Sequence, residues 1–242
     1  KKVKKIREKT NMVIGIIGAM AEEVESLKKI MKVENTMIKA GMEFFEGKLW
    51  NHDAVVVVSG IGKVNAAICS QILVDMFDVD RIINVGVAGG VSIDANPGDV
   101  VIASSLVQHD VDCTAFGERH GQIPRMDVYD FKCDESMINI AKNVELKSES
   151  NKTIVGIIAT GDQFIADNEK VKWLDSTFGA AAVEMEGASI AQVSHQNRIP
   201  FIVIRSISDN ANTGASVDFE KFVPLAVDNS MRIIEGLLRN MN

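Results

Sequence analysis

Residues 12–23 read MVIGIIGAMAEE, and this stretch decides the fold. Its first six residues form a short apolar run that predicts a buried strand over Val13–Ile17. The chain then turns and enters a predicted helix, because apolar residues recur at the i, i+3, i+7 spacing of one helical face: Val24, Leu27 and Met31. A buried strand that leads directly into a helix is the repeating unit of an α/β fold.

The same alternation continues along the chain. Helices are predicted after Met20, over Lys63–Met76, over Glu186–His195 and over Asp218–Arg239, where Pro224 is expected to kink or delay the helix. Further strands are predicted over Phe44–Leu49, Ala54–Val58, Arg81–Val87, Asp99–Ser104, Thr153–Ala159, Ala180–Met185 and Phe201–Ile207. We therefore expect an α/β fold with a central, mixed, twisted β-sheet flanked by helices.

Composition narrows the function class. The chain has 242 residues, of which 46% are hydrophobic and 24% charged, and its net charge of −7 argues against nucleic acid as a partner. No apolar run approaches the roughly 18 residues of a membrane helix, so no membrane partner is expected. The first ten residues carry a charge of +5. We interpret residues 1–11 as a basic tail and residues 12–242 as one domain, since no linker divides them.

Cysteine and histidine give no sign of a metal or a cofactor. Cys69, Cys113 and Cys133 have no CxxC spacing, which favours a reducing, cytoplasmic location. The four histidines are scattered without a ligand motif. We expect neither a metal nor an organic cofactor.

Two acidic sites follow predicted strands. Glu22 and Glu23 come after the first strand, and Asp209 closes the segment RSISD, residues 205–209, after the last strand. Active sites of open α/β sheets lie at the ends of the strands, where burial raises carboxyl pKa values toward neutrality. These carboxylates are therefore candidates for general acid and base.

Other strand ends carry glycine, aromatic or acidic residues. SGIGKVN, residues 59–65, opens a helix but lacks the third glycine of a dinucleotide fingerprint, so an NAD-dependent enzyme is a weak alternative. Glycines at 86–90 allow a ligand to approach the backbone closely. Phe164 lies just past a strand, and Glu184 and Glu186 lie at a strand-to-helix junction, where in a continuous strand they would face the same side.

Taken together, the motifs GIIGAMAEEV, SGIGKVNAA, NVGVAGG, DVDCTAFG, TGDQFIAD, VEMEGASIA and RSISD resemble those of one family. It is the 5'-methylthioadenosine/S-adenosylhomocysteine nucleosidases, the hydrolase branch of the nucleoside phosphorylase superfamily. The resemblance runs from about Met12 to the C-terminus. It implies a nucleoside phosphorylase-like fold and hydrolysis of the N-glycosidic bond between adenine and a 5'-thio-substituted ribose.

The resemblance also implies a role for each matched residue. Asp209 corresponds to the general acid that protonates adenine N7, and Glu23 to the residue that activates water. Glu186 matches the residue that binds the ribose hydroxyls. Supporting roles fall to Ser208, which orients Asp209; Met185, against the sugar; Phe164, stacked on the purine; the Ile165 backbone, at the adenine edge; Arg205, near the carboxylates; and Met20, Ile61, Ala88 and Gly89, which line the pocket.

In this family a neighbouring subunit completes the 5'-thio pocket. Phe116 and Pro124 match the residues it contributes, so the resemblance implies a homodimer. The chain departs from the family pattern at Val87, where a serine is usual, and at Glu118, where a tyrosine is frequent. Val87 removes a hydroxyl close to the ribose and the water, and the Glu118 carboxylate at the pocket mouth is expected to change which 5' substituent is preferred.

Three alternatives stay open at this point. A phosphorolytic relative would need cations or hydroxyls around a phosphate, where this chain carries Glu22 and Glu23. A hydrolase of aminodeoxyfutalosine or 5'-deoxyadenosine would share the adenosine core and hence the motifs. A non-catalytic nucleoside-binding protein would need neither Glu23 nor Asp209.

Overall fold

Strands and helices alternate along most of the chain in the computed structural model, which describes residues 12–210 and 219–241. The strands are β1 (Val13–Gly18), β2 (Lys32–Lys39), β3 (Met42–Leu49), β4 (His52–Val58), β5 (Arg81–Gly90), β6 (Val100–Gln108), β7 (Phe131–Lys132), β8 (Thr153–Thr160), β9 (Ala180–Glu184) and β10 (Phe201–Asn210). The helices are α1 (Ala21–Ile30), α2 (Lys63–Phe77), η1 (Thr114–Phe116, a 3₁₀ turn), α3 (Glu135–Ala141), α4 (Asn168–Phe178), α5 (Gly187–Asn197) and α6 (Phe219–Asn240).

Within the described residues, the strands form a single mixed sheet in the order β10-β6-β8-β9-β5-β1-β4-β3-β2, with β7 paired to β6. Strand β5 lies at its centre, parallel to β1 and β10 and antiparallel to β9. Because β10 pairs with both β5 and β6, the strands β5, β10, β6, β8 and β9 close into a ring. The predicted α/β fold with a mixed sheet is confirmed.

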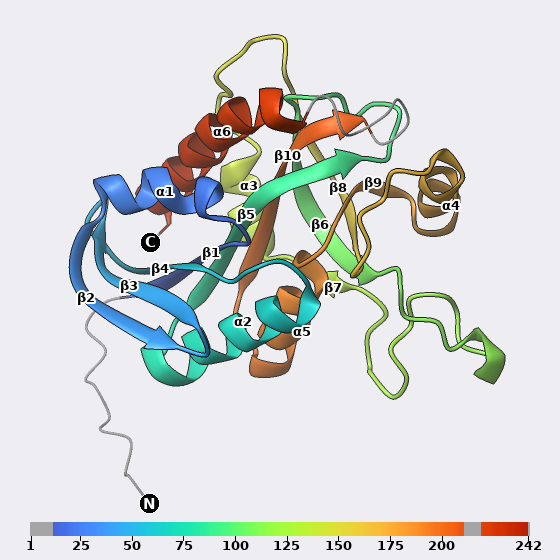
Figure 1. The fold of residues 1–242 in the computed structure, drawn as a ribbon, viewed down its shortest axis with the longest axis horizontal. Helices are drawn as coiled ribbons and strands as arrows, with labels where there is room; N and C mark the ends of the chain where they lie inside the picture. The colour runs from blue at the N-terminus through green and yellow to red at the C-terminus, as the bar shows by residue number, and fades with distance from the viewer. Residues whose placement is uncertain (1–11, 211–218, 242) are drawn as a thin grey trace, which may run out of the picture.

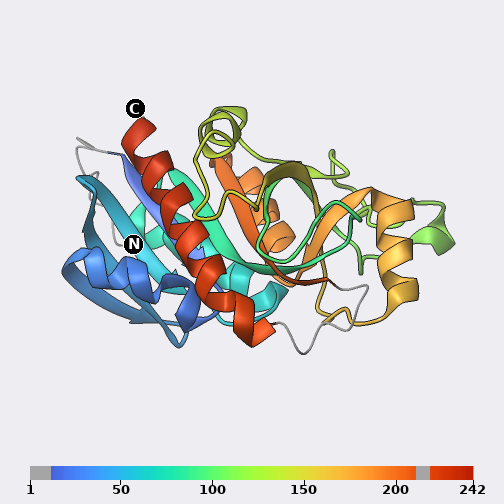
Figure 2. The same ribbon diagram turned by 90° about the horizontal axis from the view of Figure 1, so that it is seen from above.

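Helices cover both faces of the sheet. Figure 1 shows α1, α3 and α6 above the sheet and α2 and α5 below it, and Figure 2 shows α6 lying along the sheet from above. A hydrophobic core lies on each face of the sheet, because successive side chains of a strand point to opposite faces. In β4, Val56 packs into the core between the sheet and the helices α1 and α6. Val55 and Val57 pack into the core between the sheet and the helices α2 and α5.

The strands predicted from sequence all exist, with ends that differ by up to four residues. The structure adds β2, β7, α3, α4 and η1, which were not among the predicted elements. Strand β2 was missed because it is an edge strand whose side chains are almost all exposed, so it shows no apolar face. The expectation that Pro224 delays the last helix is wrong: α6 begins at Phe219 and includes Pro224. Pro224 is the sixth residue of a 22-residue helix, so it removes one i→i−4 hydrogen bond near the start while the rest of the helix keeps its bonds.

None of the helices in the described ranges, 12–210 and 219–241, is long and apolar enough to cross a membrane.

Candidate active site

A cavity of about 260 Å³ opens where β1, β5, β9 and β10 end. It gathers side chains that lie up to 190 residues apart in the sequence. Its lining residues are Ala19, Met20, Glu23, Ile61, Val87, Ala88, Gly89, Phe164, Val183, Glu184, Met185, Glu186, Ser208 and Asp209. A narrower extension of about 40 Å³ is lined by Phe164 and Asp209 and reaches Gln163 and Ile165. The two acidic sites predicted from sequence therefore meet in one place.

Glu23 is buried at the start of α1 and is fixed by backbone amides. Its Oε2 accepts hydrogen bonds from the backbone N–H of Ala19 at 2.6 Å and of Met20 at 3.0 Å, and its Oε1 accepts one from Val87 N–H at 3.2 Å. Burial raises the pKa of Glu23, and this effect outweighs the Arg205 charge and the three N–H donors, which lower it. A raised carboxyl pKa suits a base that works near neutral pH.

Gly86 in β5 allows this arrangement. A Cβ atom at position 86 would lie 2.6 Å from Glu23 Oε1 and 3.2 Å from Arg205 Nη1. Both distances are shorter than ordinary contacts, so only glycine lets the strand pass this close to the two charged groups.

Arg205 is fully buried and links the carboxylates. Its Nη2 donates to Asn84 Oδ1 at 2.6 Å and to Glu184 Oε2, and it lies 4.0 Å from Glu186 Oε2. Burial lowers the pKa of Arg205, but the charges of Glu184, Glu186 and Glu23 more than offset it, so the guanidinium stays charged. Arg205 is thus the partner that makes a buried group of carboxylates tolerable.

Glu184 holds the start of α5. Its Oε2 accepts hydrogen bonds from the backbone N–H of Gly187 at 2.8 Å and of Glu186 at 3.1 Å, and its Oε1 accepts one from the Thr160 hydroxyl. The expected strand geometry at this junction is not present, because β9 ends at Glu184 and Glu186 turns away from extended backbone with φ −132° and ψ −42°. The two carboxylates nevertheless both approach Arg205.

Glu186 faces the glycine turn before α2. Its Oε1 accepts a hydrogen bond from Gly62 N–H at 2.8 Å. Burial, followed by the Glu184 charge, raises the pKa of Glu186 to about 7, although Arg205 and the Gly62 N–H lower it. The Glu186 carboxyl group is therefore harder to ionise than that of a solvent-exposed glutamate.

Asp209 reaches the cavity because of a β-bulge. Strand β10 pairs Ile207 with Ala88 and Asp209 with Gly89, so Ser208 is the extra residue. Without the bulge Asp209 would point the same way as Ile207, which is buried in the core. The Ser208 hydroxyl donates to Asp209 Oδ2 at 2.8 Å, which fits the orienting role expected for Ser208.

Apolar residues form the rest of the cavity wall. Phe164 is 65% exposed although it lines the cavity, and Ile61 is 56% exposed at the turn before α2. Met20, Met185, Ala88 and Gly89 also line it, as expected. An aromatic ring that stands open beside a cavity is available for stacking on a flat ligand.

Phe116 and Pro124 do not line the cavity of their own chain. Phe116 ends η1 and is 88% exposed, and Pro124 is exposed in the loop that follows. Figures 1 and 2 show η1 at the outer end of the molecule, beyond α4. Sequence reasoning gave no site role to Glu184, Thr160 or Asn84, whose contacts are tertiary; only the spacing of Glu184 from Glu186 hinted at one of them.

A second, more open hollow of about 720 Å³ lies near the amino end of β10 and is lined by residues such as Arg125, His195 and Phe201. It contains none of the carboxylates that meet at the carboxyl ends of the strands, which is where ligands bind in α/β sheets. In the part of the chain that the structure describes, no group of three or more His, Cys, Asp or Glu side chains has the arrangement of a metal site.

Comparison with known proteins agrees with this geometry. Residues 13–239 match the family model described as the phosphorylase superfamily. The 5'-methylthioadenosine/S-adenosylhomocysteine nucleosidase of Tolumonas auensis is 42% identical over 231 residues, which cover 95% of this chain and all of that protein.

Two solved structures are also similar. The 5'-methylthioadenosine/S-adenosylhomocysteine nucleosidase from Colwellia psychrerythraea, solved in complex with adenine, superposes with a TM-score of 0.90 at 41% identity, covering 95% of this chain and 96% of that one. The futalosine hydrolase of Helicobacter pylori gives a TM-score of 0.88 at 35% identity, with 95% and 98% covered. The chain belongs to the phosphorylase superfamily and, within it, to the family of 5'-methylthioadenosine/S-adenosylhomocysteine nucleosidases.

Proposed function

We propose that this enzyme hydrolyses the N-glycosidic bond of 5'-methylthioadenosine and S-adenosylhomocysteine, releasing adenine and the 5-thio-substituted ribose. The observation that carries the proposal is the meeting of Glu23, Glu186 and Asp209 in one cavity beside the exposed ring of Phe164. Cleavage of a glycosidic bond passes through an oxocarbenium-like transition state, which nearby negative charge stabilises.

Asp209 is the proposed general acid. Adenine leaves readily only after protonation, and Asp209 lies beside Phe164 in the narrow extension of the cavity, where a purine stacked on that ring would present N7. Ser208 fixes Oδ2 of the carboxyl group. We propose that the Ile165 backbone pairs with the adenine edge, since Ile165 reaches the same extension.

Glu23 is the proposed base. Its carboxylate is held by N–H groups from two segments, so it keeps a fixed position from which to orient and deprotonate water. On the sugar side, the Glu186 carboxylate accepts hydrogen bonds from the ribose hydroxyls, and Met185 packs against the ribose ring. Ile61 and Met20 lie around the 5' substituent. Arg205 holds the carboxylates of Glu184 and Glu186 in position.

The position of Glu23 favours water over phosphate as the nucleophile. Converging backbone N–H groups such as those of Ala19, Met20 and Val87 are donors that would suit an anion. In this structure they already donate to Glu23. A phosphate dianion would have to displace a buried carboxylate or lie against it, so phosphorolysis is disfavoured.

The similarity to a futalosine hydrolase at 35% identity supports a second candidate class of substrate. We propose aminodeoxyfutalosine and 5'-deoxyadenosine as members of that class, since both contain adenosine's purine and ribose. All of these share adenine and ribose, so the difference lies in the 5' pocket. We propose that Glu118 adjusts that preference, whereas Val87, which lines the cavity and whose N–H donates to Glu23, alters the contacts near the ribose and the water. Comparing kcat/KM for the four nucleosides would rank them.

We further propose that the enzyme is a homodimer in which Phe116 and Pro124 complete the partner's 5' pocket. Phe116 carries a large exposed ring with no role in its own chain's cavity, and Val64 and Ile68 on α2 add exposed apolar surface at 69% and 41% exposure. Exposed apolar side chains of this kind are typical of an interface. The three cysteines are free, which supports a proposed cytoplasmic location.

The decisive experiment is adenine release from 5'-methylthioadenosine with and without phosphate, with the sugar product identified. Phosphate-independent release of free methylthioribose is the expected result. A strict phosphate requirement with formation of a sugar phosphate would overturn the role given to Glu23, and absence of release would favour another 5' group or a binding role.

A further inference from the structure

We propose that Lys63, Asp110 and Asp162 form a clamp that fixes the ribose side of the cavity to its purine side, and that this clamp sets the affinity for the whole nucleoside. None of the three side chains lines the cavity, so they are positioning residues. The inference rests on the proposed function, because the two sides are defined by Glu186 and Phe164.

The clamp is a closed ring of hydrogen bonds. The backbone N–H of Lys63 donates to Asp162 Oδ1 at 2.8 Å, and the backbone N–H of Asp162 donates to Asp110 Oδ2 at 2.9 Å. The ring closes where Lys63 Nζ donates to Asp110 Oδ1 at 2.6 Å. Three segments are tied in this way: the first turn of α2, the loop after β6 and the loop after β8.

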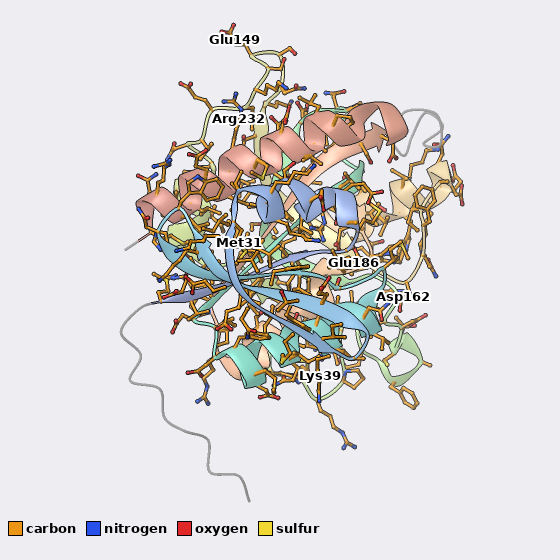
Figure 3. The ribbon with its side chains drawn as sticks, turned by 60° about the vertical axis from the view of Figure 1, so that its left-hand side comes forward. Met31, Lys39, Glu149, Asp162, Glu186 and Arg232 are labelled. Atoms are coloured by element: carbon orange, nitrogen blue, oxygen red, sulfur yellow. The ribbon has the colours of Figure 1, made fainter. Side chains whose placement is uncertain are left out.

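Each end of the clamp lies within two residues, along the chain, of a residue of the site. Gly62, next to Lys63, is the residue whose N–H binds Glu186 at 2.8 Å. Phe164 lies two residues beyond Asp162. Figure 3 labels Glu186 and Asp162 and shows them on the same side of the molecule. The clamp therefore links the turn that binds the Glu186 carboxylate to the loop that carries the Phe164 ring.

The backbone at Gly62 is shaped for this contact. Gly62 has φ +96°, and a Cβ atom there would lie 3.1 Å from Asp162 Oδ1. A side chain at this position would strain the turn and crowd the carboxylate at once. The turn and the Asp162 loop are thus fitted to each other.

Two of the three charges of the clamp, those of Lys63 and Asp110, are partly shielded from water, whereas Asp162 is exposed. The side chains of Lys63 and Asp110 are 19% and 15% exposed, and Lys63 Nζ also donates to Gln108 Oε1 at 3.1 Å. Burial would raise the pKa of Asp110, but the Lys63 ammonium and the Asp162 N–H outweigh it and hold the pKa below its usual value. A charge-assisted, shielded pair resists breakage better than a surface pair.

The same change, aspartate to asparagine, should have different effects on KM at positions 110 and 162. Asp110 uses both oxygens, so Asp110→Asn loses one of its two bonds in the ring. In the ring Asp162 uses one oxygen and its own N–H, so Asp162→Asn keeps both bonds, whereas Asp162→Ala loses one. We expect KM for 5'-methylthioadenosine to rise about tenfold in Asp110→Asn and in Asp162→Ala, and to stay within twofold in Asp162→Asn.

The experiment measures KM and kcat for these variants, together with calorimetric binding of adenine and of a 5'-methylthio C-nucleoside of adenine that cannot be hydrolysed. The clamp predicts weaker binding of the nucleoside, nearly unchanged binding of adenine and kcat within threefold of the wild type. The double variant Asp110→Asn with Asp162→Ala should be no worse than either single variant, because one ring is broken in each case. Glu169→Gln, which removes an exposed pair with Lys172, is the control.

Unchanged KM in Asp110→Asn and Asp162→Ala would overturn the clamp, as would equal losses for adenine and nucleoside, or an Asp162→Asn variant as poor as Asp162→Ala. A purely structural role would lower the melting temperature without this difference between the two ligands. If the wild type does not release adenine, the proposed function fails, and the two binding measurements still decide the clamp.

Discussion

Replacing Gly86 with alanine should disable the enzyme while leaving the fold intact. The new methyl group would lie 2.6 Å from Glu23 Oε1, where an ordinary contact needs at least 3.4 Å. The Glu23 carboxylate must therefore shift by roughly 0.8 Å, since β5 is held by neighbours on both sides and cannot retreat.

The size of the effect follows from that shift. The hydrogen bond from Val87 N–H to Glu23 is already 3.2 Å long and would break. A misplacement of about 1 Å in a catalytic group lowers the rate by about 100-fold, or about 2.7 kcal/mol of barrier. Losing a bond to a charged acceptor costs about 1.5–3 kcal/mol of folding free energy, partly offset by about 0.5–1 kcal/mol from replacing a strand glycine.

The assay compares kcat at saturating 5'-methylthioadenosine and the melting temperature for Gly86→Ala and the wild type. We expect kcat to fall about 100-fold and the melting temperature by a few degrees. Gly15→Ala is the matched control, because Gly15 lies in buried strand β1 and its added methyl would meet Leu73 Cδ1 at 3.0 Å, away from the cavity. That variant should lose some stability and keep its kcat.

A Gly86→Ala enzyme whose kcat stays within threefold of the wild type would refute the reasoning. A second check uses Glu23→Gln, which removes the base. Adding Gly86→Ala to this variant should lower kcat little further, because the alanine acts through Glu23. Fully additive losses would show that the methyl group acts by another route.

Three further predictions concern other parts of the site. Asp209→Asn should reduce kcat by about 10²–10⁴-fold with nearly unchanged binding of adenine, which steady-state kinetics and calorimetry would measure; near-normal turnover would exclude Asp209 as the acid. Because the pKa of Glu186 rises from 4.5 to about 7 on folding, its contribution to stability is greatest below pH 4.5 and is lost between pH 4.5 and 7, by about 3 kcal/mol. Urea unfolding at pH 5 and pH 8 should show this loss in the wild type and not in Glu186→Gln; equal pH dependence would contradict it. Mixing Asp209→Asn with Phe116→Ala subunits should restore about a quarter of wild-type activity, since half of the dimers would be mixed and hold one complete site; absence of recovery would argue against a shared pocket.

The sequence predicted the central strands and the helices α1, α2, α5 and α6 because apolar residues recur in them at the spacing of a strand or a helix. The ends of the strands, where the site forms, were harder to predict from the sequence. In β10 the pattern could not reveal that Ser208 is bulged, although the bulge is what directs Asp209 into the cavity. Helix α4 was missed although Val171, Leu174 and Phe178 recur at the same i, i+3, i+7 spacing as the apolar residues of α1, and these three side chains are buried in a small separate core.

The candidate site was predicted as separate residues and not as a network. Motifs identified Glu23, Glu186 and Asp209, and the structure brings all three to one cavity. The partners that hold them, such as Asn84 on Arg205 and Thr160 on Glu184, depend on which strands become neighbours. Short polar side chains of this kind carry no periodic signal, so only the folded structure reveals them.

The closed ring of strands also governs the order in which this protein can fold. Strand β5 is nearly continuous apolar sequence, and one of its partners, β10, lies 120 residues further along the chain. At synthesis rates of about 5–20 residues per second, β5 waits roughly 6–24 s for that partner. Pairing across such a separation makes folding slow, and the ring closes only when the strand that carries Asp209 arrives. The catalytic cavity is therefore among the last features to form, so a nascent chain has no adenine-releasing activity until folding is nearly complete.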